Sequence, residues 1–207
     1  MIKIIKDKDL MLDVGRYDNI FVGTNIYCTL GNGFQKDVSI HYPYVAEMNM
    51  KTNYGDKSKL GTMFECEYDG EPKFTLMFIT DGFNFRPDKN GDYLSYQALE
   101  SCLKLSNIRY EGLNIATTLL GCSRFDGNGN RDTVLDMILD IVDSYNLTIY
   151  DFEQLSNIEK YNISKQREME IKEKSFRRYY QAVSVRKERE KAVKDRIEHF
   201  KTIFEKW

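Results

Sequence analysis

The sequence predicts an α/β fold in which helices cover a mostly parallel or mixed sheet. Strand and helix patterns alternate along the first three quarters of the chain, and glycine-rich turns follow two of the buried strand patterns. The residues that break regular structure stop early, with Pro87 the last proline and Gly129 the last glycine. At 207 residues, 42% of them hydrophobic, the chain can bury one core and carry appended structure.

The first elements are two strands and a helix. Residues 2–5 fit a short strand, and residues 20–28 fit a buried strand that ends at the glycine turn 31–33. Apolar residues then recur every three or four positions, as on one helix face: Phe34, Val38, Tyr42, Val45 and Met48. Because proline lacks a backbone N–H, Pro43 is expected to bend or restart this helix.

A hairpin follows. Residues 63–68 and 74–80 are rich in β-forming side chains, and the turn residues 69–72 separate them. Residues 93–105 then carry apolar side chains on one helical face.

The last elements of this part repeat the alternation. Residues 113–120 form a second buried strand pattern that ends at Gly121, and residues 147–152 form a final strand. A second amphipathic helix lies between them on these apolar positions: Val134, Leu135, Ile138, Ile141, Val142 and Tyr145. In such sheets, ligands bind beyond the carboxyl ends of the strands.

Charge divides the chain into two regions. Residues 153–207 contain 15 Lys and Arg against 10 Asp and Glu, a net charge of +5, so the overall −2 leaves −7 for residues 1–152. We therefore expect a globular domain over 1–152 and a charged helical extension over 153–207. In the extension, apolar residues spaced four, three, four, three form a short heptad seam: Val193, Ile197, Phe200, Phe204 and Trp207.

The extension has several candidate roles. Its helices could pack on the domain or pair in a homodimer. Residues 177–180 and 186–189 mix cations with aromatics, as nucleic-acid-binding segments do, but interleaved glutamates favour the first two roles.

Composition excludes other classes. No run of about 18 apolar residues exists, so no membrane span is expected, and the first ten residues do not fit a secretory signal. We expect a cytoplasmic protein, in the host cytoplasm if the gene is viral. The four cysteines contain no C-x-x-C pair and the two histidines lie at opposite ends, so neither a metal site nor a cofactor is expected.

Two loops carry the chemical signal. Residues 29–35 and 121–130 each follow a buried strand and precede an amphipathic helix. Glycine lets the backbone approach an anion closely, and the following helix adds the positive end of its dipole. Two such loops could hold the two phosphates of a diphosphate, although each alone also fits an ordinary strand-to-helix turn.

Three segments in order, residues 23–35, 55–62 and 120–129, resemble the macro domain family. The likeness is to its phage and bacterial branch that processes ADP-ribose-1″-phosphate, and it covers residues 1–152. It implies a three-layer α/β/α sandwich with a mixed sheet, to which the helical extension is attached. It also implies that the ligand is ADP-ribose or a related NAD-derived nucleotide.

The resemblance assigns roles to single positions. Asp9 corresponds to the aspartate that accepts a hydrogen bond from the adenine amino group, with a solvated turn aspartate as the alternative. Asn25 corresponds to the asparagine at the distal ribose, although its amide could equally hold the loop together. Phe152 corresponds to an aromatic side chain against the adenine, although an aromatic at a strand end can also belong to the core. Arg124, a bidentate donor, is expected to pair with a terminal phosphate. The other positions expected to contact the ligand are Thr24, Leu30, Gly31, Asn32, Gly33, Phe34, Gly121, Cys122, Ser123, Phe125, Gly127 and Gly129.

The sequence indicates less about catalysis than about ligand binding. Asn25 and Asp126 are the candidate catalytic residues, but one group of related hydrolases also uses a lysine after the central strand, where this chain has Asp81. Two hypotheses stay open. One is an enzyme that acts on ADP-ribose-1″-phosphate or another ADP-ribosyl compound. The other is a non-catalytic module that senses or sequesters such a nucleotide, as a viral counter-defence protein would.

Overall fold

The computed structural model describes residues 1–6, 8–81, 93–123, 127–151 and 169 of the 207. The chain divides into two units, Met1–Lys160 and Tyr161–Trp207. All described residues except Met169 belong to the first unit. The predicted boundary at residues 152–153 and the predicted heptad seam lie outside the described residues.

The first unit is built on a six-stranded sheet with strand order β1-β6-β5-β2-β4-β3. Neighbouring strands are parallel except for β3 and β4, which form the predicted antiparallel pair. The predicted mixed sheet is therefore confirmed. The strands are β1 (Ile2–Ile5), β2 (Asn19–Asn25), β3 (Met63–Cys66), β4 (Phe74–Thr80), β5 (Asn114–Thr118) and β6 (Asn146–Tyr150).

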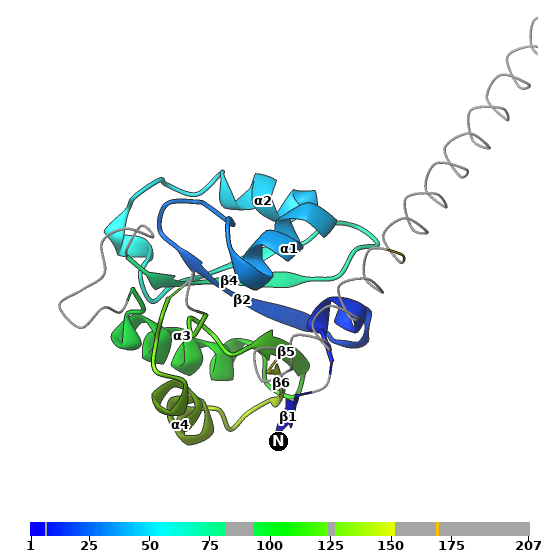
Figure 1. Ribbon diagram of the computed structural model, residues 1–207, viewed down its shortest axis with the longest axis vertical. Coiled ribbons are helices and arrows are strands. Elements are labelled where there is room, and N and C mark those ends of the chain that lie inside the picture. Colours follow the sequence, from blue (N-terminus) through cyan, green and yellow to red (C-terminus); the bar gives the residue numbers. More distant parts are fainter. Residues whose placement is uncertain (7, 82–92, 124–126, 152–168, 170–207) are drawn as a thin grey trace, which may run out of the picture. The chain divides into compact units, whose positions relative to one another are not determined.

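Helices cover both faces of this sheet. One face carries α1 (Gly33–His41) and α2 (Pro43–Asn49), and the other carries α3 (Tyr96–Arg109) and α4 (Arg131–Ile141), as Figure 1 shows. Three short 3-10 helices complete the described elements: η1 (Leu10–Leu12), η2 (Val14–Arg16) and η3 (Lys57–Lys59). The predicted α/β/α sandwich is confirmed.

Strand β2 links the two cores. Ile20 and Val22 point into the core beneath α1 and α2, whereas Phe21 points into the core beneath α3 and α4. Since β4 and β5 flank β2, every residue from Asn19 to Thr24 is buried. A strand covered on both faces is apolar along most of its length, which explains the continuous apolar pattern in the sequence.

Several predicted boundaries move by a few residues. The strand predicted over 20–28 ends at Asn25, because the chain turns at Ile26 and Tyr27, where the Asn25 Oδ1 accepts from the Tyr27 N–H. The helix predicted from residue 93 begins at Tyr96, because the Ser95 Oγ accepts from the Ala98 N–H and caps it. Pro43 begins α2, so the predicted restart is confirmed.

The second amphipathic helix is shorter than predicted. It ends at Ile141, and Val142 and Tyr145 follow in non-helical backbone although both are buried. Their apolar side chains continue to fill the core after the helix ends. The apolar pattern in the sequence therefore predicted a helix end that is several residues too late. The strand predicted over 113–120 likewise contracts to Asn114–Thr118.

We expect Phe21→Ala to lower the free energy of unfolding by about 3–5 kcal/mol. Phe21 is fully buried, and its ring packs edge-on against Tyr110 and Tyr145 at centroid distances of 5.0 and 5.8 Å. Denaturant unfolding followed by circular dichroism measures the change. Ile108→Ala removes an apolar side chain that is 82% exposed and should change stability little. Equal losses in both variants would contradict this account of the core.

Candidate functional site

The parallel strands bring the predicted ligand loops to one edge of the sheet. Strands β1, β6, β5, β2 and β4 run in the same direction, so their carboxyl ends share that edge. The first loop, taken as residues 26–35 so as to contain the predicted residues 29–35, follows β2 there and runs into the first turn of α1. The second loop, taken as residues 119–130 so as to contain the predicted residues 121–130, follows β5. The edge is thus the place where the predicted site residues can meet.

The side chain of Asn25 organises the start of the first loop. Its Nδ2 donates to the Thr29 carbonyl oxygen at 3.0 Å and to the Thr29 Oγ1 at 2.8 Å. Its Oδ1 accepts from the backbone N–H of Tyr27 at 2.9 Å. Both ends of the amide are therefore engaged within the loop, so Asn25 holds the loop together.

The rest of the first loop is divided between core and edge. The side chains of Leu30 and Phe34 pack against the core beneath α1 and α2, so the bulk of Phe34 faces the protein interior. Gly31 is exposed, and a methyl group built on it would meet nothing within 4 Å. Asn32 stands at the N-cap of α1 but makes no side-chain cap hydrogen bond.

The two loops approach each other at Gly33 and Ser123. Gly33 has a left-handed φ of 51°, and a methyl group built on it would lie 3.7 Å from the Ser123 Oγ. The start of α1 therefore faces the second loop directly. The two loops, which two separate glycine patterns marked in the sequence, thus lie next to each other in the folded chain.

The glycines of the second loop serve close backbone packing. A methyl group at Gly127 would overlap the carbonyl oxygen of Gly121, and one at Gly129 would overlap the Leu94 side chain. Gly121 itself has a φ of 68° and lies against Leu94. Hydrogen bonds from Gly129 N to Gly121 O and from Leu94 N to Gly127 O, both 3.0 Å, hold this arrangement. These glycines let the loop fold onto itself.

Two other predicted ligand residues are buried. Thr24 is fully buried, and its carbonyl oxygen accepts from the Thr80 Oγ1 at 3.3 Å. Cys122 is 7% exposed and its side chain joins the core beneath α3 and α4. Contact between either side chain and a ligand at the edge would require rearrangement, whereas their backbone groups belong to the loops.

Asp9 follows β1 and caps the first 3-10 helix. Its Oδ1 accepts from the Met11 N–H at 3.0 Å, and the residue is 4% exposed. The predicted adenine contact through Asp9 is a separate role that stays a prediction. Arg124, Phe125, Asp126 and Phe152 lie outside the described residues, so their predicted roles stay predictions too.

The residue after the central strand forms an ion pair. Asp81 follows β4, and its Oδ2 lies 3.6 Å from the Lys57 Nζ. Lys57 comes from η3 and its side chain is 78% exposed. Asp81, which stands where the resemblance led us to look for a lysine, is thus paired with a lysine from another segment.

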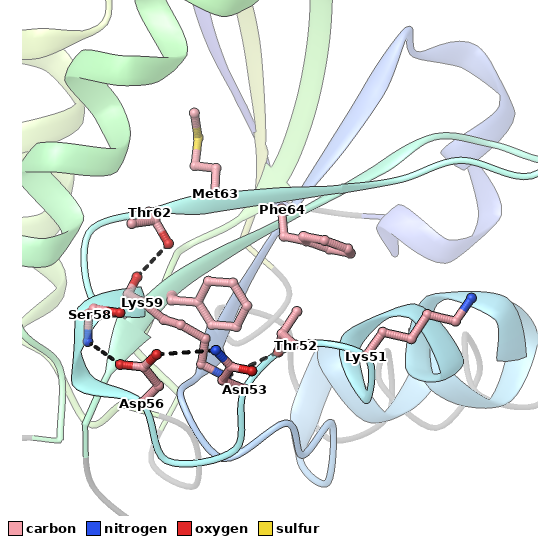
Figure 2. Close-up of a pocket in the computed structure, with 10 residues that line it drawn as sticks. Lys51, Thr52, Asn53, Asp56, Ser58, Lys59, Thr62, Met63 and Phe64 are labelled. Atoms are coloured by element: carbon pink, nitrogen blue, oxygen red, sulfur yellow. Dashed lines mark hydrogen bonds between the residues drawn. The ribbon is translucent and has the colours of Figure 1, made fainter.

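A cavity of about 380 Å³ lies beside the first loop and was not predicted from the sequence. Its lining comes from the segment between α2 and β3, from β3 itself and from β4 (Figure 2): Lys51, Thr52, Asn53, Asp56, Ser58, Lys59, Thr62, Met63, Phe64 and Phe78. None of the predicted ligand residues lines it. The sequence signal was weak, because Phe78 joins residues 51–64 only in the folded chain.

The described residues contain neither a candidate metal centre nor a candidate membrane-spanning helix. Within them, no three His, Cys, Asp or Glu side chains gather closely enough to hold a metal ion. None of the helices in the same part of the chain is long and apolar enough to span a membrane.

Comparisons with known proteins identify the fold. The macrodomain of Thermus aquaticus DarG matches with a TM-score of 0.53 at 15% identity, over 73% of this chain and 98% of that one. Thermosipho africanus DarTG, solved in complex with ADP-ribose, matches with a TM-score of 0.52 at 16% identity, over 68% and 40%.

A macrodomain mutant from Oceanobacillus iheyensis, solved with ADPR, gives a TM-score of 0.50 at 12% identity, over 83% of this chain and 92% of that one. No protein-family model matches the sequence, and no curated protein matches it either. The chain therefore has the macrodomain fold. At 12–16% identity, its likeness to these three proteins is one of structure and not of sequence.

We expect Gly127→Ala to lower the free energy of unfolding by about 1–3 kcal/mol, the usual cost of overpacking. The added methyl group would overlap the Gly121 carbonyl oxygen, which belongs to rigid backbone. Thermal unfolding measures the loss. Gly31→Ala is the matched control, since its methyl group has open space and should leave the melting temperature unchanged. Equal melting temperatures for the two variants would contradict the packing role of Gly127.

Stability should also depend on the charge of Asp37 in α1. Burial raises the pKa of this carboxyl from 3.8 to about 6, against the smaller opposing effect of Lys36. The folded chain therefore takes up this proton at higher pH than the unfolded chain does. The contribution of Asp37 to the free energy of unfolding is largest below about pH 4 and is lost as the pH rises through about 6.

Denaturant unfolding of wild type and Asp37→Asn across this pH range isolates the contribution. As the pH falls from about 7 to about 4, the free energy of unfolding of the wild type should rise relative to that of Asp37→Asn. Parallel profiles for the two proteins would contradict it.

Proposed function

We propose that the chain binds ADP-ribose or a related NAD-derived nucleotide at the carboxyl edge of its sheet, between the first and second loops. The approach of Gly33 to Ser123 is the observation that carries this proposal. It brings two glycine-containing loops together where the fold class binds ligands. The ADP-ribose found in the DarTG and Oceanobacillus iheyensis structures supports the ligand class.

The start of α1 is the proposed phosphate-binding element. The first N–H groups of a helix lack partners within the helix and attract anions. At α4 the Asn130 Oδ1 accepts from the Thr133 N–H at 3.0 Å, whereas Asn32 provides no such cap to α1. A phosphate near Gly33 would supply the acceptor that Asn32 does not.

The remaining predicted contacts complete the proposal. The adenine lies toward Asp9 and Phe152, the distal ribose toward Asn25, and Arg124 pairs with a distal phosphate when the ligand carries one. Gly31 contributes open space beside the ligand. Asp9 already caps η1 through one carboxylate oxygen, and a carboxylate has acceptor sites on both oxygens.

The geometry favours a binding module over a hydrolase. Both ends of the Asn25 amide are engaged by Tyr27 and Thr29, and Asp81 replaces the lysine of the related hydrolases. A nucleophile without its activating partner loses most of its rate. We therefore favour a module that senses or sequesters the nucleotide. Hydrolysis of ADP-ribose-1″-phosphate through Asn25 and Asp126 is the alternative.

Titration calorimetry with ADP-ribose tests binding. Gly31→Val places a branched side chain in the open space of the first loop and is expected to weaken binding at least tenfold without lowering the melting temperature. Gly70→Asn is the matched control. Gly70 precedes β4, at the opposite edge of the parallel strands, and its φ of 77° suits asparagine. Equal affinities for wild type and Gly31→Val would refute this location.

Assay of phosphate released from ADP-ribose-1″-phosphate separates the two hypotheses. Binding without release is expected for the proposed module. Release that is lost in Asp126→Asn but retained in Gly70→Asn would establish the hydrolase instead.

A further inference from the structure

Lys59 is a buried cation that forms no salt bridge with an acidic side chain in the described part of the chain. The residue is 8% exposed, and no acidic side chain of the described residues lies within 4 Å of its Nζ. Its Nζ donates to the Thr52 Oγ1 at 3.1 Å and to the Cys28 Sγ at 3.3 Å. It also lies 4.7 Å from the centroid of the Phe78 ring. All three partners are neutral groups or weak acceptors.

Removing an ammonium ion from water costs several kcal/mol unless a counter-charge offsets the loss. Hydrogen bonds to a hydroxyl and a thiol, together with an aromatic face, recover part of that cost. A negative ligand would recover more. The position of Lys59 is therefore unusual for a purely structural lysine, because buried charges in proteins are generally paired.

The 380 Å³ cavity gives such a ligand a place to bind. Lys59 and Thr52 both line it, and Figure 2 shows the Lys59 side chain running toward Thr52. Phe64 and Phe78 contribute apolar surface to the same lining. Cavities of about 300–1,000 Å³ are the usual size for small-molecule sites.

Of the two lysines that line the cavity, Lys59 is the buried one. Lys51 is exposed and extends away from the other lining residues in Figure 2. Asp56 accepts from the Ser58 N–H at 2.9 Å and from the Asn53 Nδ2 at 3.4 Å, so its carboxylate caps η3. The hydrogen bonds from Ser58 and, to a smaller extent, the charge of Lys59 lower the pKa of this carboxyl, although the two side chains form no salt bridge. With two lysines and one aspartate the lining has a net charge of 2 − 1 = +1.

We propose that this cavity binds a small organic oxyanion, with its carboxylate or phosphate at Lys59 and Thr52 and its apolar body against Phe64 and Phe78. The site is distinct from the proposed nucleotide site, since none of the residues proposed there lines it. The first loop connects the two sites, however. Its residue Cys28 lies between Asn25 and Gly31 in the sequence and hydrogen-bonds to Lys59 and Thr52 of the cavity.

Matched aromatic probes test the charge requirement without any nucleotide present. Benzoate and benzamide have nearly the same shape and differ in charge, and phenyl phosphate replaces the carboxylate by a phosphate. Backbone amide shifts of Thr52, Asn53 and Lys59 in nitrogen-15 NMR spectra report binding. We expect benzoate or phenyl phosphate to bind at least tenfold more tightly than benzamide. The tighter of the two identifies the head group. Equal shifts with benzamide, or none with either anion, would overturn the proposal.

Lys59→Met removes the charge and retains an unbranched apolar stem beside Phe78. It should abolish the preference for benzoate over benzamide, whereas Lys59→Arg should retain it. Lys73→Met is the control, because Lys73 pairs with Glu67 at 2.8 Å and does not line the cavity. An undiminished preference in Lys59→Met would show that Lys59 is structural. Should that variant fail to fold, the wild-type comparison of benzoate with benzamide decides alone. Either result leaves the ADP-ribose titration unaffected as a test of the nucleotide site.

Discussion

The burial of β2 on both faces and along both edges governs the rest of the molecule. From Asn19 to Thr24 every residue is enclosed by β4, β5 and the two helical layers. A strand in that position has no surface on which polar chemistry could lie. Exposed polar groups can appear only where the strand ends, at Asn25, so the parallel arrangement concentrates candidate ligand contacts at one edge. The fold and the location of the site are thus consequences of one packing constraint.

The sequence predicted the elements whose burial has a clear period. The ends of β1 and β4 agree with the structure, and Pro43 starts α2 as its missing N–H required. Predicted boundaries were wrong where residues just beyond a strand or helix are also buried. Ile26 is fully buried although it lies beyond β2, and Tyr145 is buried beyond α4. Such residues extend an apolar pattern past the true boundary. The three 3-10 helices were missed because a single turn is too short to show a period.

The candidate site was predictable in outline and less so in the role of each residue. Glycine in a loop indicates close approach of the backbone, but the sequence does not say to what. At Gly121, Gly127 and Gly129 the approaching groups belong to the protein itself, whereas Gly31 has open space. Lys59 could not have been singled out among 30 basic residues, because two of the side chains it contacts, Cys28 and Phe78, are distant in sequence.

The hydrogen bonds at the ends of the second loop have an evolutionary consequence. The carbonyl oxygen of Ser123 accepts from the N–H groups of Gly127 and Asn128 at 3.1 and 3.0 Å. Both bonds join main-chain groups of the flanking residues, so neither needs a particular side chain between them. Substitutions between positions 123 and 127 that keep the length of the loop would therefore leave these bonds available. Related chains could diversify ligand preference in that short interval, as antibodies do in their hypervariable loops, without selection having to rebuild the sheet.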